Sequence, residues 1–266
     1  SDVRRMCPLA PTTKILWYNE AKEKFNLSDI KSAYNSCNNY GKIKVIQNGK
    51  LIDVKVNKFN LSANYEITLS NGLKIKTTAN HLNKVLDKNY VQTKDLKVSD
   101  YLPISLTPFE NTKNMSYEQG KFIGAYLGDG SKDGSTGITY SLNPIEDKEL
   151  IDWLQEYGAK IFGKHFSFYI TNEKGTSCSL SMYSHSLRGL IDDFVDGTTA
   201  INKSLNMKAI NQSIEFRKGI IDGYLLTDGS HSSSKRKDVI YTASKNMVES
   251  MQALCGSLGI PTDLKT

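Results

Sequence analysis

The chain has 266 residues, of which 39% are hydrophobic and 23% charged, so its composition is that of a folding protein and not of a disordered chain. At about 150 residues per domain, this length predicts one large domain or two ordinary ones. No apolar run approaches the roughly 18 residues of a membrane helix, so we expect a cytoplasmic protein without membrane contacts. The four cysteines include no CxxC pair, which argues against a zinc site or a disulfide framework.

Charge is distributed unevenly along the chain. The formal net charge is +6, which permits a nucleic-acid partner without requiring one. Residues 1–108 hold 17 basic and 9 acidic residues, whereas residues 109–266 hold 17 and 19. The change in composition falls in a connector that contains Pro103 and Pro108, so we predict a domain boundary near Pro108.

Short alternating apolar runs predict that the first segment is an all-β domain. The strongest signal is a hairpin in which Tyr65–Ser70 and Leu73–Thr78 are joined by Asn71-Gly72, because this pair adopts positive φ at low cost. Upstream, we expect a short strand near residues 13–17 and a helix with a loop over residues 18–40.

Three stretches of this segment resemble the motifs of inteins, which excise themselves from host proteins. Cys7–Ile15 resembles the opening motif, whose first residue is the nucleophile, and Gly72–His81 resembles the second motif, a strand ending in Thr-x-x-His. Lys94–Pro103 resembles the segment that closes the N-terminal splicing region. Taken singly, Cys7 and His81 have the ordinary interpretation of a buried small residue and a satisfied histidine. Together, the motifs imply the N-terminal part of a Hint splicing domain over residues 7–108.

The resemblance implies a chemical role for each matched residue. The Cys7 thiol attacks the carbonyl carbon of Met6 and replaces the peptide bond by a thioester, for which cysteine is nucleophilic enough at neutral pH. Histidine titrates near neutrality, so His81 is suited to protonate the leaving Cys7 nitrogen. Thr78 and Asn80 are expected to hold the scissile peptide by hydrogen bonds.

The ends of the sequence suggest an incomplete splicing element. Residues 1–6 are expected to be a remnant of the host extein, and Val3–Cys7 faintly resembles a stretch of anaerobic ribonucleotide reductases. Inteins end in His-Asn before a host Cys, Ser or Thr, whereas this sequence ends at Pro261–Thr266. We therefore expect the N-terminal part of an intein, from a split intein or a truncated sequence. Its partners would be a complementary C-terminal intein fragment and the host extein protein.

The second segment contains an internal repeat. Gly120–Ser131 matches Gly219–Ser230 at an offset of 99 residues, including glycines spaced four apart. Glycine costs a helix about 1 kcal/mol relative to alanine, so a glycine face predicts close packing of the two helices on each other. Asp129 and Asp228 would then lie at the same end, where a divalent cation would relieve their repulsion. The alternative for each is an ordinary helix-terminal turn residue.

These helices resemble the signature of LAGLIDADG homing endonucleases in the two-motif form. The resemblance implies an α+β domain over residues 109–266, with two pseudo-symmetric αββαββα halves of which the second is incomplete. It also implies that Asp129 and Asp228 bind Mg²⁺ during cleavage of double-stranded DNA. Residues 202–206 resemble a Lys-x-x-Pro segment, which makes Lys203 a catalytic candidate; its alternative is a solvated loop lysine.

The same resemblance predicts a DNA-binding saddle of two antiparallel sheets. Polar loops would reach towards the DNA at residues 131–135 and 231–237, the latter with Lys235, Arg236 and Lys237. Strands are expected at residues 137–140, 166–171, 178–182 and 238–242.

The leading hypothesis is the N-terminal part of an intein with an inserted Mg²⁺-dependent endonuclease. The alternatives are a stand-alone homing endonuclease and an inactive DNA-binding LAGLIDADG scaffold, each with a Hint accessory domain.

Overall fold

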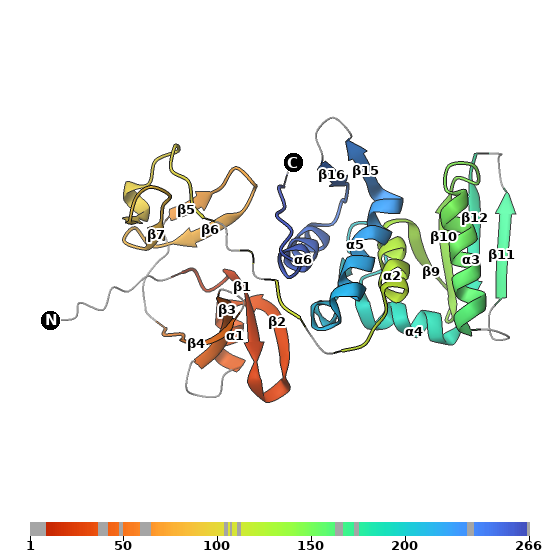
Figure 1. Cartoon of the computed structure of the whole chain (residues 1–266), viewed down its shortest axis with the longest axis horizontal. Helices are drawn as coiled ribbons and strands as arrows, with labels where there is room; N and C mark the ends of the chain where they lie inside the picture. The colour runs from red at the N-terminus through yellow and green to blue at the C-terminus, as the bar shows by residue number, and fades with distance from the viewer. Residues whose placement is uncertain are drawn as a thin grey trace. The chain divides into compact units, whose positions relative to one another are not determined.

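The computed structural model describes residues 9–36, 42–47, 50–58, 65–103, 106, 108–110, 113–162, 167–172, 176–232 and 237–264. The chain divides into unit 1, Ser1–Phe109 with Gly259–Thr266, and unit 2, Glu110–Leu258 (Figure 1). In the described ranges, no helix is both long and apolar enough to span a bilayer.

The division after Phe109 lies one residue from the predicted boundary, but the C-terminal end differs from the prediction. Residues 259–266 were expected to belong to the second domain, and they group with unit 1 instead. Leu264 N donates to Asn71 O at 2.8 Å. Gly72 has φ +82°, and a Cβ there would stand 2.6 Å from the Leu264 Cβ. The returning segment therefore packs on the turn of the predicted hairpin.

Unit 1 contains a four-stranded sheet of order β2-β1-β3-β4 (Figure 1). Its core consists of Trp17, Ala33 and Ile43, which are all buried. The sheet and its helix comprise β1 (Lys14–Asn19), β2 (Lys24–Asp29), α1 (Ile30–Ser36), β3 (Lys42–Gln47) and β4 (Lys50–Lys55), with a 3-10 turn at Glu20–Lys22.

A helix and a loop were predicted over residues 18–40, and this prediction is wrong for residues 24–29, which form the strand β2. This strand pairs with β1 along its whole length, from Lys14↔Asp29 to Asn19↔Lys24. Its sequence is polar apart from Phe25 and Leu27, and only Phe25 is buried. Pairing with a neighbouring strand satisfies the backbone of β2, so the strand forms without a strong apolar alternation of its own.

Two hairpins complete unit 1: β5 (Tyr65–Thr68) with β6 (Lys74–Thr77), and β7 (Leu82–Lys84) with β8 (Tyr90–Gln92). The predicted hairpin around Asn71-Gly72 is present, but only Gly72 of this pair has positive φ. Leu69 N donates to Leu73 O at 2.9 Å, and Gly72 N donates to Leu69 O at 3.0 Å. The connection is therefore a wider turn closed by a left-handed glycine.

Unit 2 begins with a helix, two strands, a helix, two strands and a helix. Their sheet has the order β11-β12-β10-β9. The elements are α2 (Tyr117–Asp129), β9 (Gly130–Asp133), β10 (Gly137–Leu142), α3 (Lys148–Phe162), β11 (Ser167–Asn172), β12 (Cys178–Tyr183) and α4 (His185–Phe194). Strands were predicted near the positions of β10, β11 and β12, whereas the predicted loop at residues 131–135 is wrong because β9 includes residues 131–133.

The second part of unit 2 repeats only the beginning of this order. It contains α5 (Ile214–Asp228), β15 (Gly229–Ser232), β16 (Lys237–Ile240) and α6 (Lys245–Gly256), and β15 and β16 form a sheet of two strands. The expected loop at residues 231–237 is wrong at both ends, because residues 231–232 belong to β15 and Lys237 begins β16; Lys235 and Arg236 lie outside the described residues. The short pair β13 (Val195–Asp196) and β14 (Ser204–Leu205) and a 3-10 helix at Met207–Asn211 precede α5.

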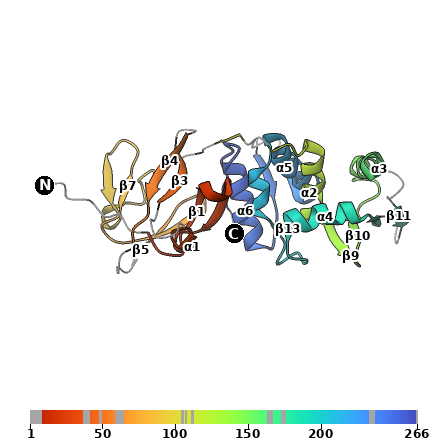
Figure 2. The same cartoon turned by 90° about the horizontal axis from the view of Figure 1, so that it is seen from below.

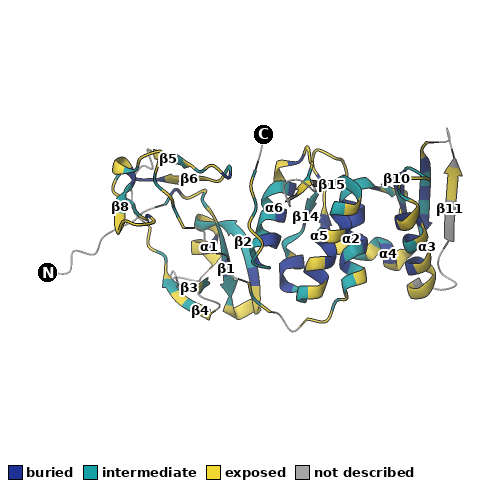
Figure 3. Ribbon diagram, turned by 45° about the horizontal axis from the view of Figure 1, so that its top comes forward, coloured by how far each residue is buried: buried dark blue, intermediate teal, exposed yellow. Residues whose placement is uncertain are grey.

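The glycine faces of α2 and α5 meet, as the repeat predicted. Both views in Figures 1 and 2 show the two helices side by side. A Cβ at Gly120 would stand 3.1 Å from Ile220 N, and one at Gly124 would stand 2.8 Å from Tyr224 N. The contact points advance in the same direction along both helices, so the helices are parallel. Figure 3 shows that the facing sides of both helices are buried.

Candidate functional site

The predicted residues Thr78, Asn80 and His81 lie together in the turn between β6 and β7. Thr78 Oγ1 donates to Asn80 Oδ1 at 2.8 Å, and His81 N donates to Thr78 O at 3.1 Å. Thr78 is buried, His81 is partly buried and Asn80 is exposed. Three polar residues, one of them a histidine, are thus held in one tight turn.

The beginning of the described chain lies beside this turn. Leu9 forms an antiparallel bridge with Thr77, and Ala10 N donates to Lys76 O at 2.8 Å. Cys7 lies outside the described residues, as do residues 1–6. It precedes Leu9 by two residues, so chain length alone limits the separation of their Cα atoms to about 7 Å, at about 3.6 Å per residue.

A second group lies at the C-terminal ends of the paired helices. Asp129 is the last residue of α2 and Asp228 is the last residue of α5. A Cβ at Gly128 would stand 3.4 Å from Asp228 Cγ, so the carboxyl of Asp228 lies against the residue that precedes Asp129. Because α2 and α5 are parallel, the two carboxylates reach the same end of the helix pair.

The environment of these carboxylates opposes their ionisation. Burial raises the pKa of Asp129 to about 6, and the charges of Asp228 and Asp147 act in the same direction. Burial also raises the pKa of Asp228. The Lys203 ammonium opposes both shifts, because a nearby cation favours the ionised form. Both carboxyl groups are therefore harder to ionise than a carboxyl group in water.

Lys203 holds the end of α2. Its ammonium donates to Tyr126 O at 3.2 Å, Gly128 O at 3.0 Å and Gly130 O at 2.9 Å. An ammonium has three N–H donors, and the last carbonyls of a helix lack partners within it. Lys203 is 5% exposed, so the alternative of a solvated loop lysine is wrong. Burial lowers its pKa, whereas Asp228 and Asp129 raise it.

Replacing Lys203 by Met is expected to lower the free energy of unfolding by about 2–3 kcal/mol, because buried carbonyls lose their donor. Urea denaturation would measure the change. Lys218→Met is the matched control, since Lys218 pairs with Glu215 on the surface, 3.1 Å away, where ion pairs contribute only about 0–1 kcal/mol. Equal losses in both variants would contradict the capping role.

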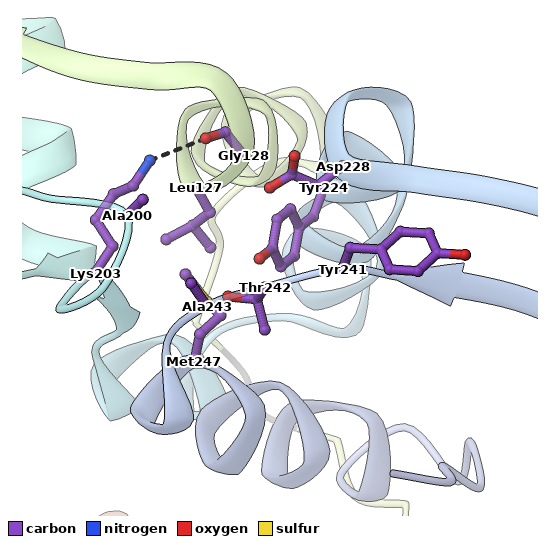
Figure 4. Close-up of a pocket in the computed structure, with 10 residues that line it drawn as sticks. All are labelled: Leu127, Gly128, Ala200, Lys203, Tyr224, Asp228, Tyr241, Thr242, Ala243 and Met247. Atoms are coloured by element: carbon purple, nitrogen blue, oxygen red, sulfur yellow. Dashed lines mark hydrogen bonds between the residues drawn. The ribbon is translucent and has the colours of Figure 1, made fainter. Parts of the chain in front are cut away.

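A pocket of 410 Å³ opens beside Asp228 (Figure 4). The ends of α2 and α5, the loop before β14, residues 241–243 and Met247 line it. Figure 4 shows the Asp228 carboxylate close to the Tyr224 ring, with Lys203 extending to Gly128. Burial raises the pKa of Tyr224 to about 12, so this phenol stays neutral. Asp129 is not among the lining residues.

The two halves of the internal repeat are covered to different extents. At the offset of 99, Tyr140 in β10 corresponds to Val239 in β16, and these residues are 0% and 37% exposed. Leu127 in α2 corresponds to Leu226 in α5, and they are 2% and 47% exposed. In the first half, α4 packs against α2 and β10. In the described part of the chain, no second copy of β11, β12 and α4 follows α6.

The donor set suits a divalent cation such as Mg²⁺. Carboxylate oxygens are the protein ligands that Mg²⁺ prefers, and one or two carboxylates with water commonly complete its coordination. Burial raises the pKa of both Asp129 and Asp228, so the ionised carboxylates are disfavoured there and a bound cation would offset part of that cost. No cluster of three or more His, Cys, Asp or Glu residues with metal-binding geometry occurs within the described ranges. Asp129 and Asp228, at the ends of α2 and α5, are the carboxylates that could contribute ligands to such a cation.

Comparison with known proteins gives one limited similarity. No protein-family model matches the chain. The chain is distantly related to DNA-directed RNA polymerase subunit Rpo1C of Methanocaldococcus jannaschii, with 23% identity over 150 residues. The match covers 56% of this chain but only 17% of that subunit.

Some residues around the two sites do not stand out in the sequence. Tyr224 and Tyr241 line the pocket, and Asn83 and Thr93 contact the backbone of His81. In the internal repeat, Tyr241 corresponds to the buried Leu142, and this difference between the two halves is the sequence signal that could have pointed to Tyr241. Asn83 and Thr93 carry no comparable signal, because their contacts depend on the pairing of β7 with β8.

Proposed function

We propose that this chain is the N-terminal part of a Hint-type intein that carries a LAGLIDADG-type DNA endonuclease domain. The pairing of Leu9 with Thr77 is the observation that carries the splicing part, because it ties the chain two residues after the expected nucleophile to the strand end that leads into Thr78 and His81. Both ends of unit 2 connect to segments of unit 1. This connectivity supports an endonuclease that is inserted into a splicing domain.

In the proposed acyl shift, the Cys7 sulfur forms a bond with the Met6 carbonyl carbon, and the Met6–Cys7 carbon–nitrogen bond breaks. The thiol gives its proton to solvent, the freed nitrogen gains one from His81, and His81 regains its proton from solvent, so the step is a balanced rearrangement. Thr78 and Asn80, which are joined by a 2.8 Å hydrogen bond, would orient the scissile peptide.

In the proposed endonuclease, Asp129 and Asp228 would hold Mg²⁺ at the end of the parallel helices. When bound, Mg²⁺ supplies Lewis-acid stabilisation of the scissile phosphate and a more acidic water molecule. Lys203 supports this site by holding the carbonyls at the end of α2 and by its charge. Direct contact of Lys203 with a phosphate stays a prediction.

The similarity to the polymerase subunit is compatible with this proposal. A module that occurs inside larger proteins would share a short segment with a long chain, and the match covers only 17% of the subunit. If the shared segment were instead a structural part of a polymerase, neither thiol-dependent cleavage nor a role for Cys7 would be expected.

Incubating the chain with a small thiol is expected to release residues 1–6, which mass spectrometry would detect. Cys7→Ala should abolish the release, because no other residue supplies the nucleophile. His81→Ala should slow it by about 100-fold or more, the usual contribution of a general acid. Cleavage after Met6 that persists in the Cys7→Ala protein would contradict the proposal.

A DNA-binding scaffold that does not cut DNA is the second candidate for unit 2. It is favoured by the three Lys203 hydrogen bonds, which leave no ammonium proton for a phosphate. Mg²⁺-dependent cleavage of DNA by this chain would reject this candidate.

A further inference from the structure

Three hydrogen-bond donors hold the backbone carbonyl of His81. Its carbonyl oxygen accepts from Thr93 N at 2.8 Å, from Asn83 Nδ2 at 3.2 Å and from Thr93 Oγ1 at 3.3 Å. A carbonyl oxygen has two lone pairs, so three donors saturate it. Thr93 provides two of the three hydrogen bonds, through both its backbone and its side chain.

The Thr93 hydroxyl also connects His81 to the end of β6. Its oxygen lies 2.9 Å from Thr77 Oγ1 and accepts from Asn83 Nδ2 at 3.0 Å. Thr77 and Thr93 are 0% and 6% exposed, so water competes little for these hydroxyls. Hydrogen bonds in such buried networks reinforce one another, and a partly broken network is costly.

The residue after Thr93 holds the other side of the same turn. Lys94 N donates to Ala79 O at 3.0 Å, while Thr93 N donates to His81 O. Both residues belong to the 3-10 turn Thr93–Asp95, which directly follows β8. Two successive amide groups therefore hold alternate carbonyls of the segment that contains Thr78, Asn80 and His81.

We propose that Thr93 is a positioning residue for His81, and that its hydroxyl is required for the His81 imidazole to protonate the Cys7 nitrogen. This inference rests on the proposed splicing function. Thr93 does not touch the reacting atoms. Its hydroxyl connects the His81 backbone to the side chain of Thr77, the residue directly before Thr78. A valine would fill nearly the same volume, so the hydroxyl itself is the feature under test.

The test compares Thr93→Val with Thr93→Ser in the full chain. NMR would follow the pH titration of the His81 imidazole, whose signal is assigned by its absence in a His81→Gln protein. Thr93→Val should move the titration midpoint and slow thiol-induced release of residues 1–6 by about tenfold, since misplacing a catalytic group by about 1 Å costs up to about 100-fold. Thr93→Ser keeps the hydroxyl and should retain the midpoint and a rate within about twofold.

An unchanged His81 titration in Thr93→Val would overturn the inference, even if the variant is less stable. Equal loss of rate in the Val and Ser variants would do the same, because it would indicate a packing role. If the wild-type chain releases nothing, the splicing proposal fails while the titration still decides whether Thr93 controls His81. Should Thr93→Val not fold, Asn83→Ala removes another donor to the His81 carbonyl and is judged by the same titration.

Discussion

Replacing Gly124 by Ala is expected to destabilise unit 2 by about 3 kcal/mol, the upper end of the usual cost of overpacking. The new Cβ would stand 2.8 Å from Tyr224 N and closer still to the Ile220 carbonyl oxygen. These are backbone atoms of α5, which cannot move aside as a side chain can. The helices must separate, and urea denaturation followed by circular dichroism would measure the cost.

Gly189→Ala in α4 is the matched control for this prediction. A Cβ at Gly189 would meet no atom within 4 Å. Here alanine should raise stability by about 0.5–1 kcal/mol, because it loses less conformational freedom than glycine in a helix. The two substitutions are therefore expected to have opposite signs. A neutral Gly124→Ala would show that α2 and α5 do not depend on a glycine interface.

Asp129→Asn is expected to have opposite effects on activity and stability. If unit 2 cleaves DNA with Mg²⁺, the variant should lose cleavage by about 100-fold or more, because it removes one of two carboxylate ligands. At neutral pH the same variant should be more stable by about 1–2 kcal/mol after allowing for solvent screening. The gain arises because burial and Asp228 make ionisation of Asp129 unfavourable.

The stability difference should depend on pH in a defined way. The pKa of Asp129 rises from 3.8 to about 6 on folding, so between these values the folded protein holds a proton that the unfolded chain releases. Wild-type stability therefore falls as pH rises through this window and levels off above it. Asp129→Asn lacks this contribution, so its advantage should be full above about pH 6 and absent below about pH 4.

Urea denaturation of both proteins from pH 4 to pH 8 would measure this dependence. Asp152→Asn is a suitable control, because Asp152 forms a surface ion pair with Lys148 at 2.7 Å and should change stability by about 1 kcal/mol or less. An Asp129→Asn protein that is less stable at neutral pH would contradict the conclusion that burial and the Asp228 charge disfavour ionisation of Asp129. Retention of DNA cleavage in that variant would contradict the metal-binding role.

The sequence could predict features that depend on local pattern. The hairpin around Gly72 was predictable because alternating apolar strands flank a residue suited to positive φ. The meeting of α2 and α5 was predictable from the repeat, since glycines such as Gly124 and Gly223 would weaken a helix unless a neighbour needed the space. This packing in turn implied that Asp129 and Asp228 share one end.

The sequence could not reveal features that depend on partners distant in the chain. The strand β2 is defined by its pairing with β1, and the return of Leu264 to Asn71 depends on a turn nearly 200 residues earlier. The position of Lys203 follows from the unsatisfied carbonyls at the end of α2, which become its neighbours only in the folded unit.

By itself, the sequence determined the glycine-packed helix pair, the positions of several strands and the residue types of both candidate sites, because these follow from spacing and backbone propensity. Only the tertiary structure decided which polar groups meet. It buried Lys203 among carbonyls, joined His81 to Thr93 and left Tyr241 open where Leu142 is covered. The physical reason is that desolvation and hydrogen bonding depend on neighbours that folding brings together.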